Sequence, residues 1–202
     1  MARQGLTGER LAEVGAELAD EVGFDQLTVS AVARRVGVQP ASLYAHVGGT
    51  GDLRARVALL ALEELADLVS EALAGRAGTD ALVAYADVYR DYARAHPGRW
   101  AAMQTSLDPV TAARSAGPRI AAMTRAILRG YDLAGEDQTH AVRLIGSMLR
   151  GFIDLEAAGS FDHTTPEPAV SWRRTLVALD TLLRAWPPHA ERDPDQPLLE
   201  GP

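Results

Sequence analysis

The chain has 202 residues, a net charge of −7 and 47% hydrophobic residues, of which few are aromatic. The absence of cysteine excludes disulfides, zinc–thiolate sites and cysteine nucleophiles. Abundant Ala and Leu favour an all-α fold over a sheet. Acidic residues interrupt the N-terminal segment and no apolar run is long enough for a bilayer, so we expect neither a secretory leader nor a membrane span.

Periodic apolar residues separated by Gly and Pro predict about nine helices. The expected segments are 7–22, 29–36, 40–46, 52–74, 80–95, a short one with Trp100 and Met103, 117–131, 136–158 and 170–185. The first helix is expected to bury Leu11, Val14, Leu18 and Val22. These segments predict a small domain at 1–51, a larger helical domain at 52–186 and a disordered tail, rich in Pro and acidic residues, at 187–202.

The segment TVSAVARRVGVQPASLYAHV at 28–47 has the form of two short helices joined by a tight turn. Thr28 is suited to cap the first of these helices, and Gly37 to adopt the left-handed conformation that ends it. Ala33 is small enough to let the two helices cross closely. The remaining inward positions are expected to share a core with the preceding helix, and they are Val32, Val36, Val38 and Leu43.

Together with Asp52 and Leu53, this segment resembles the DNA-binding domain of the tetracycline-repressor-like (TetR) family over about residues 7–55. The resemblance implies a homodimeric regulator in the bacterial cytoplasm, most often a repressor, that binds a palindromic double-stranded DNA operator. It also implies a larger C-terminal domain that dimerises and binds a small effector. By hypothesis, the effector changes the spacing of the two recognition helices, which is roughly 34–36 Å on B-DNA. Activation of transcription, the opposite direction of regulation, remains the alternative to repression.

In this family the third helix enters the major groove, and the match assigns ten positions to DNA. They are Thr28, Arg34, Arg35, Gln39, Pro40, Ala41, Ser42, Tyr44, His46 and Thr50. Gln39 is expected to read adenine, and Tyr44 and His46 to contact phosphates. Core packing of Tyr44 and a structural hydrogen bond of His46 stay open. The family usually has a phosphate-binding Lys at the position of Thr50 and an aromatic residue at that of Val47.

The charge of the expected DNA-binding segment differs in sign from that of the whole chain. Residues 26–57 contain four Arg and one Asp, a sum of +3 in a chain of −7. Charges at contact distance dominate at physiological salt, where the Debye length is roughly 8 Å. Since +3 is modest, we expect weak non-specific binding and salt-sensitive binding of the dimer to paired sites. Arg54 or Arg56 could compensate for the missing Lys.

Aromatic and Met side chains of the middle helices are expected to line an effector pocket for a hydrophobic or aromatic small molecule. They are Tyr85, Tyr89, Tyr92, Trp100, Met103, Met123, Ile127, Met148 and Phe152. Each of them could instead belong to the core. Arg150 and His140 could anchor a polar group of the effector, and the alternative for Arg150 is an ion pair with Asp154, four residues on.

Two amphipathic stripes near the C-terminal end are expected to form a four-helix interface between two copies of the chain. They contain Ile145, Leu149, Trp172, Leu176, Leu179 and Leu183. Packing of these residues within one chain is the alternative. The segment LRGFIDLEAAGSF at 149–161 resembles a C-terminal domain type named after a Trp-His-Gly motif, with Arg150 at the position of its His.

The sequence contains no pattern typical of catalysis, and we expect no enzyme, no metal and no cofactor. GGTG at 48–51 lacks the Gly-Lys-Ser/Thr ending and the preceding strand of a phosphate loop, so a plain turn is expected. The five His residues show no metal-ligand spacing. One alternative from another functional class remains: a helical small-molecule-binding or interaction protein with a weakened DNA-binding motif.

Overall fold

The computed structural model describes residues 6–133 and 135–187, which form ten α-helices and two short 3-10 helices and contain no strand. The predicted all-α fold is therefore confirmed. The helices are α1 (Gly8–Val22), η1 (Phe24–Gln26), α2 (Val29–Val36), α3 (Pro40–Leu43), α4 (Thr50–Leu73), α5 (Gly78–Ala95), α6 (Pro97–Ala102), α7 (Pro109–Arg114), α8 (Gly117–Leu128), η2 (Arg129–Tyr131), α9 (Glu136–Ala157) and α10 (Pro168–Arg184). The sequence did not predict α7, which Asp108 caps by accepting the N–H groups of Val110 and Thr111.

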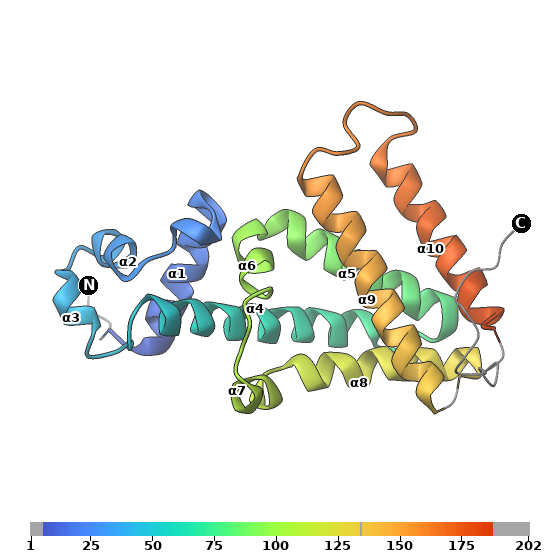
Figure 1. Cartoon of the computed structure of the whole chain (residues 1–202), viewed down its shortest axis with the longest axis horizontal. Coiled ribbons are helices and arrows are strands. Elements are labelled where there is room, and N and C mark those ends of the chain that lie inside the picture. The colour runs from blue at the N-terminus through green and yellow to red at the C-terminus, as the bar shows by residue number, and fades with distance from the viewer. Residues whose placement is uncertain (1–5, 134, 188–202) are drawn as a thin grey trace, which may run out of the picture.

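The helices fall into two groups along the long axis of the molecule (Figure 1). The first three helices gather at one end, and α5 and α8–α10 at the other. α4 runs along the axis and joins the two groups, while α6 lies beside α1 and α4. None of the helices in the described part of the chain is long and apolar enough to cross a membrane.

Local sequence signals determine the ends of the first helices. The Thr7 side chain accepts the N–H of Arg10, and the Thr28 side chain accepts the N–H of Ala31, each at 3.1 Å. These bonds satisfy donors that have no partner within the first turn of a helix. Gly37 ends α2 with φ +72°, a left-handed conformation that a side chain would strain. The predicted bounds of α2, 29–36, are confirmed.

The two groups of helices have separate hydrophobic cores that meet within α4. Val57 and Ala58 belong to the N-terminal core, and Ala61 and Leu65 to the larger one. The two cores therefore meet between Ala58 and Ala61, and the division of the chain into domains at residue 51 stays a prediction. The expected tail at 187–202 lies, apart from Pro187, outside the described residues.

Two expectations, one for a buried residue and one for a helix end, need correction. Val22 is 50% exposed, because the N-terminal core ends near Leu18 and the last turn of α1 extends beyond it. The third helix ends at Leu43, and residues 44–46 form a turn in place of the expected helical end. Val36 and Val38 are only partly buried, although both pack against the N-terminal core as predicted.

The predicted dimer stripes are also wrong as an interface. All six residues are buried in the core of their own chain, namely Ile145, Leu149, Trp172, Leu176, Leu179 and Leu183. The stripe of α9 faces α5 and α8, and that of α10 faces α5 and α9. Packing within one chain, the alternative reading, accounts for their periodicity.

Candidate nucleic-acid interface and effector cavity

The short helix α3 presents its polar side chains to solvent. Gln39, Ala41 and Ser42 are exposed, whereas Leu43 is completely buried and anchors the helix to the N-terminal core. The Ser42 hydroxyl donates a 2.7 Å hydrogen bond to the Gln39 carbonyl, which stabilises the first turn. Pro40 occupies a first-turn position, where its missing N–H costs nothing. Three of the four residues predicted to read bases are therefore accessible to solvent.

Tyr44 and His46 follow α3 in the same turn. The Tyr44 side chain is 59% exposed, so core packing does not explain it. His46 is half-buried, and no side-chain hydrogen bond to its ring is found among the described residues. Tyr44 is therefore accessible to a partner, and the phosphate contacts of Tyr44 and His46 stay a prediction.

Two threonines complete the N-terminal end of α2. Thr28 accepts the N–H of Ala31, and the Thr50 hydroxyl accepts the N–H of Val29 at 3.4 Å. Thr50 therefore has a structural role where the family usually has a phosphate-binding Lys. This hydrogen bond joins the start of α2 to the start of α4, a contact that no local sequence pattern predicted.

The glycine-rich segment 48–51 is a turn that Asp52 organises. The Asp52 carboxylate accepts the N–H of Gly48 at 2.8 Å and a hydrogen bond from Arg56 at 3.0 Å. Burial opposes ionisation of Asp52, but these two bonds outweigh it and lower its pKa. Arg56 is consequently engaged within the chain.

The other arginines predicted to supply positive charge differ in their partners. Arg35 forms two hydrogen bonds, of 2.7 and 2.5 Å, with Glu21 of α1, and these bonds lower the pKa of Glu21. Arg54 donates to the main-chain carbonyls of Leu27 and Asp25, which hold the guanidinium against η1 without neutralising its charge. Arg34 is exposed, and no ion pair is found for it among the described residues.

A cavity of about 420 Å³ lies where α4, α5, α6, α8 and α9 meet. This volume is within the range of small-molecule sites, roughly 300–1,000 Å³. Its lining consists of Leu62, Leu65, Tyr89, Trp100, Met103, Gly117, Ile120, Arg143, Gly146, Ser147 and Arg150.

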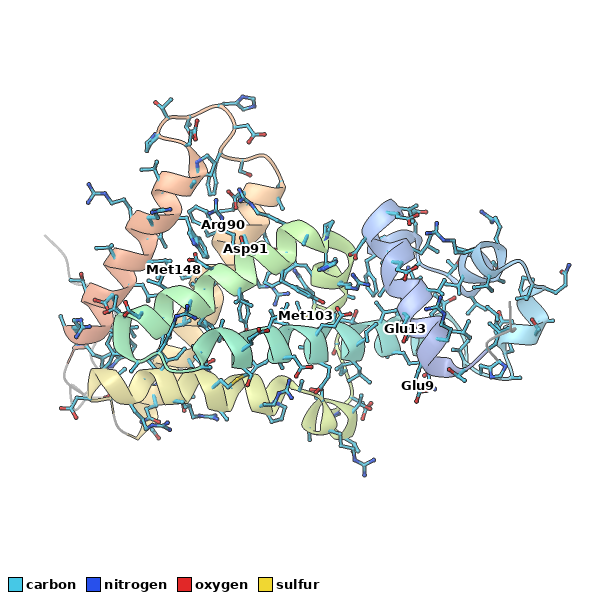
Figure 2. The ribbon with its side chains drawn as sticks, turned by 180° about the vertical axis from the view of Figure 1, so that it is seen from behind. Glu9, Glu13, Arg90, Asp91, Met103 and Met148 are labelled. Carbon is cyan, nitrogen blue, oxygen red and sulfur yellow. The ribbon has the colours of Figure 1, made fainter. Side chains whose placement is uncertain are left out.

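Three of the nine residues predicted for the pocket line this cavity: Tyr89, Trp100 and Met103. The other six do not line it but lie in or against the core of the larger domain, and they are Tyr85, Tyr92, Met123, Ile127, Met148 and Phe152. Figure 2 shows Met103 beside α4, and it shows Met148 well apart from Met103. Residue type alone could not separate them, because aromatic and Met side chains fill cores and pockets equally well.

Of the α9 residues that line the cavity, the sequence analysis named only Arg150. Arg143, Gly146, Ser147 and Arg150 follow the i, i+3, i+4, i+7 spacing of one helix face, which is a signal that polar residues can also carry. Arg150 lies 3.6 Å from Asp154 as well, so its predicted ion pair and its place at the cavity are both found. His140 is exposed and does not line the cavity.

A chain of hydroxyl groups ends at the cavity wall. Thr124 lies 2.9 Å from the Tyr85 hydroxyl, which in turn donates to the Tyr89 hydroxyl at 2.8 Å. Burial raises the pKa of both phenols, so both stay protonated at neutral pH. Since Tyr89 accepts this bond, its own proton remains available as a donor on the cavity side.

The helix α6 belongs to both parts of the molecule. Ala102 is part of the N-terminal core, whereas Trp100 and Met103 line the cavity. A Cβ atom on Gly98 would lie 2.1 Å from the carbonyl carbon and oxygen of Ala19, so only glycine permits this contact with α1. The sequence indicated Gly98 only as part of a helix stop.

The exposed helix α3 follows α2 after the left-handed Gly37, and its Leu43 packs in the N-terminal core. This arrangement is typical of a helix-turn-helix DNA-binding protein. The comparisons agree with this class. Residues 11–57 match the model of the bacterial regulatory proteins of the tetR family, and residues 82–179 match the tetracyclin repressor-like C-terminal domain. The chain belongs to the TetR family of transcriptional regulators. The description of the second model names no Trp-His-Gly motif, so that finer assignment stays a prediction.

Relatives and solved structures support the same membership. The chain is 35% identical over 161 residues to the uncharacterised HTH-type transcriptional regulator Rv0681 of Mycobacterium tuberculosis, covering 78% of this chain and 73% of that one. It is 28% identical to the uncharacterised HTH-type regulator YobS of Bacillus subtilis, covering 80% and 84%. The TetR-family regulator PfmR of Thermus thermophilus has a similar structure, with a TM-score of 0.63, 25% identity and 89% and 97% coverage. For SCO7222, a TetR from Streptomyces coelicolor, these values are 0.69, 19%, 90% and 99%, a likeness of fold.

Proposed function

We propose that the protein is a homodimeric repressor that binds a palindromic operator and is released by a small effector. The observation that carries this proposal is the double role of α6. One side of the helix is fixed to α1 of the DNA-binding domain, and the other side forms part of the cavity wall.

The attachment of α6 to α1 is polar as well as steric. The Asp20 carboxylate accepts hydrogen bonds from the main-chain N–H and the guanidinium of Arg99, each at 2.9 Å. The His96 ring nitrogen lies 3.1 Å from the same carboxylate. An effector that displaces Trp100 would therefore move α6 and α1 together, because the helices are joined at several points. Such a displacement changes the orientation of α3 relative to its symmetry mate.

We place the dimer contact on the outward face of α10 in place of the buried stripes. Val170 and Val177 are seven residues apart, so they share a face, and they are 50% and 62% exposed. Arg173 and Arg174 lie between them and frame a shallow hollow. An exposed apolar strip rimmed by charge is typical of a self-complementary interface across a two-fold axis.

A second function is favoured by one specific observation. Arg35 and Arg56 are paired with carboxylates of the same chain, and Thr50 stands where the family usually has a Lys, so the unpaired positive charge available to DNA is small. A small-molecule-binding or interaction protein with a weakened DNA-binding motif would have these features.

A mobility-shift titration separates the two functions. The full chain is mixed at graded salt with its own upstream intergenic DNA and with a shuffled duplex of equal length. We expect a salt-sensitive shift that is selective for the intergenic duplex, and reduced transcription in vitro from the promoter it contains. Gln39→Ala should lower affinity for that duplex about 5- to 100-fold, the effect of one lost base contact. The matched variant Gln26→Ala, at an exposed position of η1, should bind normally. Equal binding of both duplexes by the wild type would favour the second function.

A further inference from the structure

The charged groups that line the cavity are both cations, and its hydroxyl groups can donate hydrogen bonds. The α9 side contributes Arg143, Ser147 and Arg150, and the opposite wall contributes the Tyr89 hydroxyl. No carboxylate is among the lining residues. A ligand with hydrogen-bond acceptors and negative charge would satisfy these groups, whereas a cationic ligand would find no counter-ion among the lining residues and would be repelled by the two arginines.

The charge at the cavity mouth amounts to a single positive charge. Asp154 lies behind Arg150 at 3.6 Å and accepts a hydrogen bond from the Trp100 indole at 2.8 Å. Its charge therefore offsets that of Arg150. Arg143 is exposed, and no ion pair is found for it within 6–133 and 135–187. A remaining charge of +1 matches a monoanion rather than a dianion.

The rest of the lining is apolar. The apolar part of the cavity wall consists of Leu62 and Leu65 of α4, Ile120 of α8, Met103 and the Trp100 ring. Burial of apolar ligand surface there contributes about 25 cal/mol per Å². The cavity is thus suited to a molecule with an apolar body and one anionic end.

We propose that the effector is a carboxylic acid with an apolar body, whose carboxylate binds Arg143 and Arg150 at the mouth of the cavity. A guanidinium presents two parallel N–H groups to a carboxylate, which gives both affinity and orientation. The Tyr89 hydroxyl, on the opposite wall, donates to an acceptor farther along the ligand. This inference rests on the proposed function of the cavity as the effector site.

Matched probes test the proposal by titration calorimetry of the full chain without DNA. Octanoate is compared with octan-1-ol and octylamine, and naphthalene-2-carboxylate with its amide. We expect each acid to bind about tenfold or more tightly than its neutral partner, the effect of one charge-assisted contact. The amine should bind weakest. Equal or better binding of the neutral or cationic probes, or no binding of either acid, would overturn the proposal.

Variants locate the site. Arg143→Gln with Arg150→Gln should reduce the preference for acids to within about threefold while leaving the affinity for octan-1-ol unchanged. Arg125→Gln, an exposed arginine of α8 outside the cavity, is the charge control. Gly146→Phe should abolish binding of all probes, because a Cβ there meets nothing within 4 Å and the ring can enter the cavity. Gly151→Phe, equally open but outside the cavity, should bind normally. Unchanged acid binding by Gly146→Phe would place the site elsewhere and contradict the proposal.

The two proposals fail in different ways. If acids bind in the cavity but leave the DNA complex intact, effector release is wrong and the ligand class stands. If only neutral or cationic compounds dissociate the DNA complex, the ligand class is wrong and effector release stands.

Discussion

The main-chain N–H of Arg99 donates a 2.9 Å hydrogen bond to the carboxylate of Asp20, and this bond joins α6 to α1. A main-chain donor cannot turn away as a side chain can, so the position of α6 determines the position of Asp20. Gly98, one residue earlier, brings the two backbones into direct contact. The cavity and the DNA-binding domain are therefore connected by backbone contacts as well as by side chains.

Gly98→Ala should separate α6 from α1. The added Cβ would lie 2.1 Å from backbone atoms of Ala19, which cannot move aside without displacing the helix. We expect the free energy of unfolding to fall by about 1–3 kcal/mol, the usual cost of overpacking, as measured by urea denaturation. Gly151→Ala is the control, because a Cβ there meets nothing within 4 Å and Ala favours the helix. If both variants are as stable as the wild type, the result contradicts a close backbone contact between α6 and α1.

Glu21→Gln should strengthen DNA binding. The substitution removes the carboxylate that holds Arg35 through two hydrogen bonds, and so makes one more cation available per protomer. The slope of log affinity against log salt should steepen by about 0.9 for each phosphate that is newly contacted. The measurement is a fluorescence-anisotropy titration of operator DNA at several salt concentrations.

Arg35→Gln with Glu21→Gln is the control for the Glu21 prediction. This double variant removes the same acidic charge but leaves no cation to release. Its salt slope should return to the wild-type value. A double variant as steep as Glu21→Gln would show that Arg35 is not responsible.

Glu156→Gln should destabilise the larger domain. Glu156 accepts bonds of 2.8 and 2.6 Å from the buried Arg90, whose guanidinium also lies over the rings of Phe152 and Trp172. The variant removes the carboxylate that is hydrogen-bonded to this buried cation, at a cost of about 3 kcal/mol at neutral pH. Asp91→Asn is the control, since Asp91 is the exposed neighbour of Arg90 on α5 (Figure 2) and a surface change of this kind costs less than about 0.5 kcal/mol.

The same ion pair predicts a dependence of stability on pH. The hydrogen bonds from Arg90 lower the pKa of Glu156 below its ordinary value of 4.5. Its contribution is therefore complete above about pH 5 and is lost as the pH falls through the lowered pKa. In urea titrations the stability difference between the wild type and Glu156→Gln should shrink as the pH is lowered below 4.5. A constant difference between them from neutral to acidic pH would contradict the assignment.

Val177→Asp should dissociate the proposed dimer. Val177 is 62% exposed on α10, so the folded protomer tolerates a charge there, whereas a buried interface would not. Light scattering after gel filtration should report a monomer, and binding to a paired operator should be lost. Val110→Asp is the control, because Val110 is similarly exposed but lies on α7. A Val177→Asp variant that stays dimeric would place the interface on another face.

The local signals of the sequence predicted the helix-turn-helix accurately. Thr28 and Gly37 determine the bounds of α2 through contacts within one helical turn, so no distant residue was needed. The stripe of Ile145 and Leu149 was read correctly as buried, but the sequence could not show what covers it. Periodicity identifies an apolar face and does not distinguish a partner helix of the same chain from one of another copy.

The sequence by itself determined the all-helical class, the DNA-reading segment and the number of charges near it. Only the tertiary structure decided which of those charges are paired and where they are held, because Arg35 binds the carboxylate of Glu21 fourteen residues away and Arg54 donates to the main-chain carbonyl of Asp25 twenty-nine residues away. It also decided that α6 joins the cavity to α1 and that Arg143 and Arg150 stand at the cavity mouth. Hydrogen bonds and close contacts between distant segments depend on how the helices pack, and that packing is a property of the whole chain rather than of any local pattern.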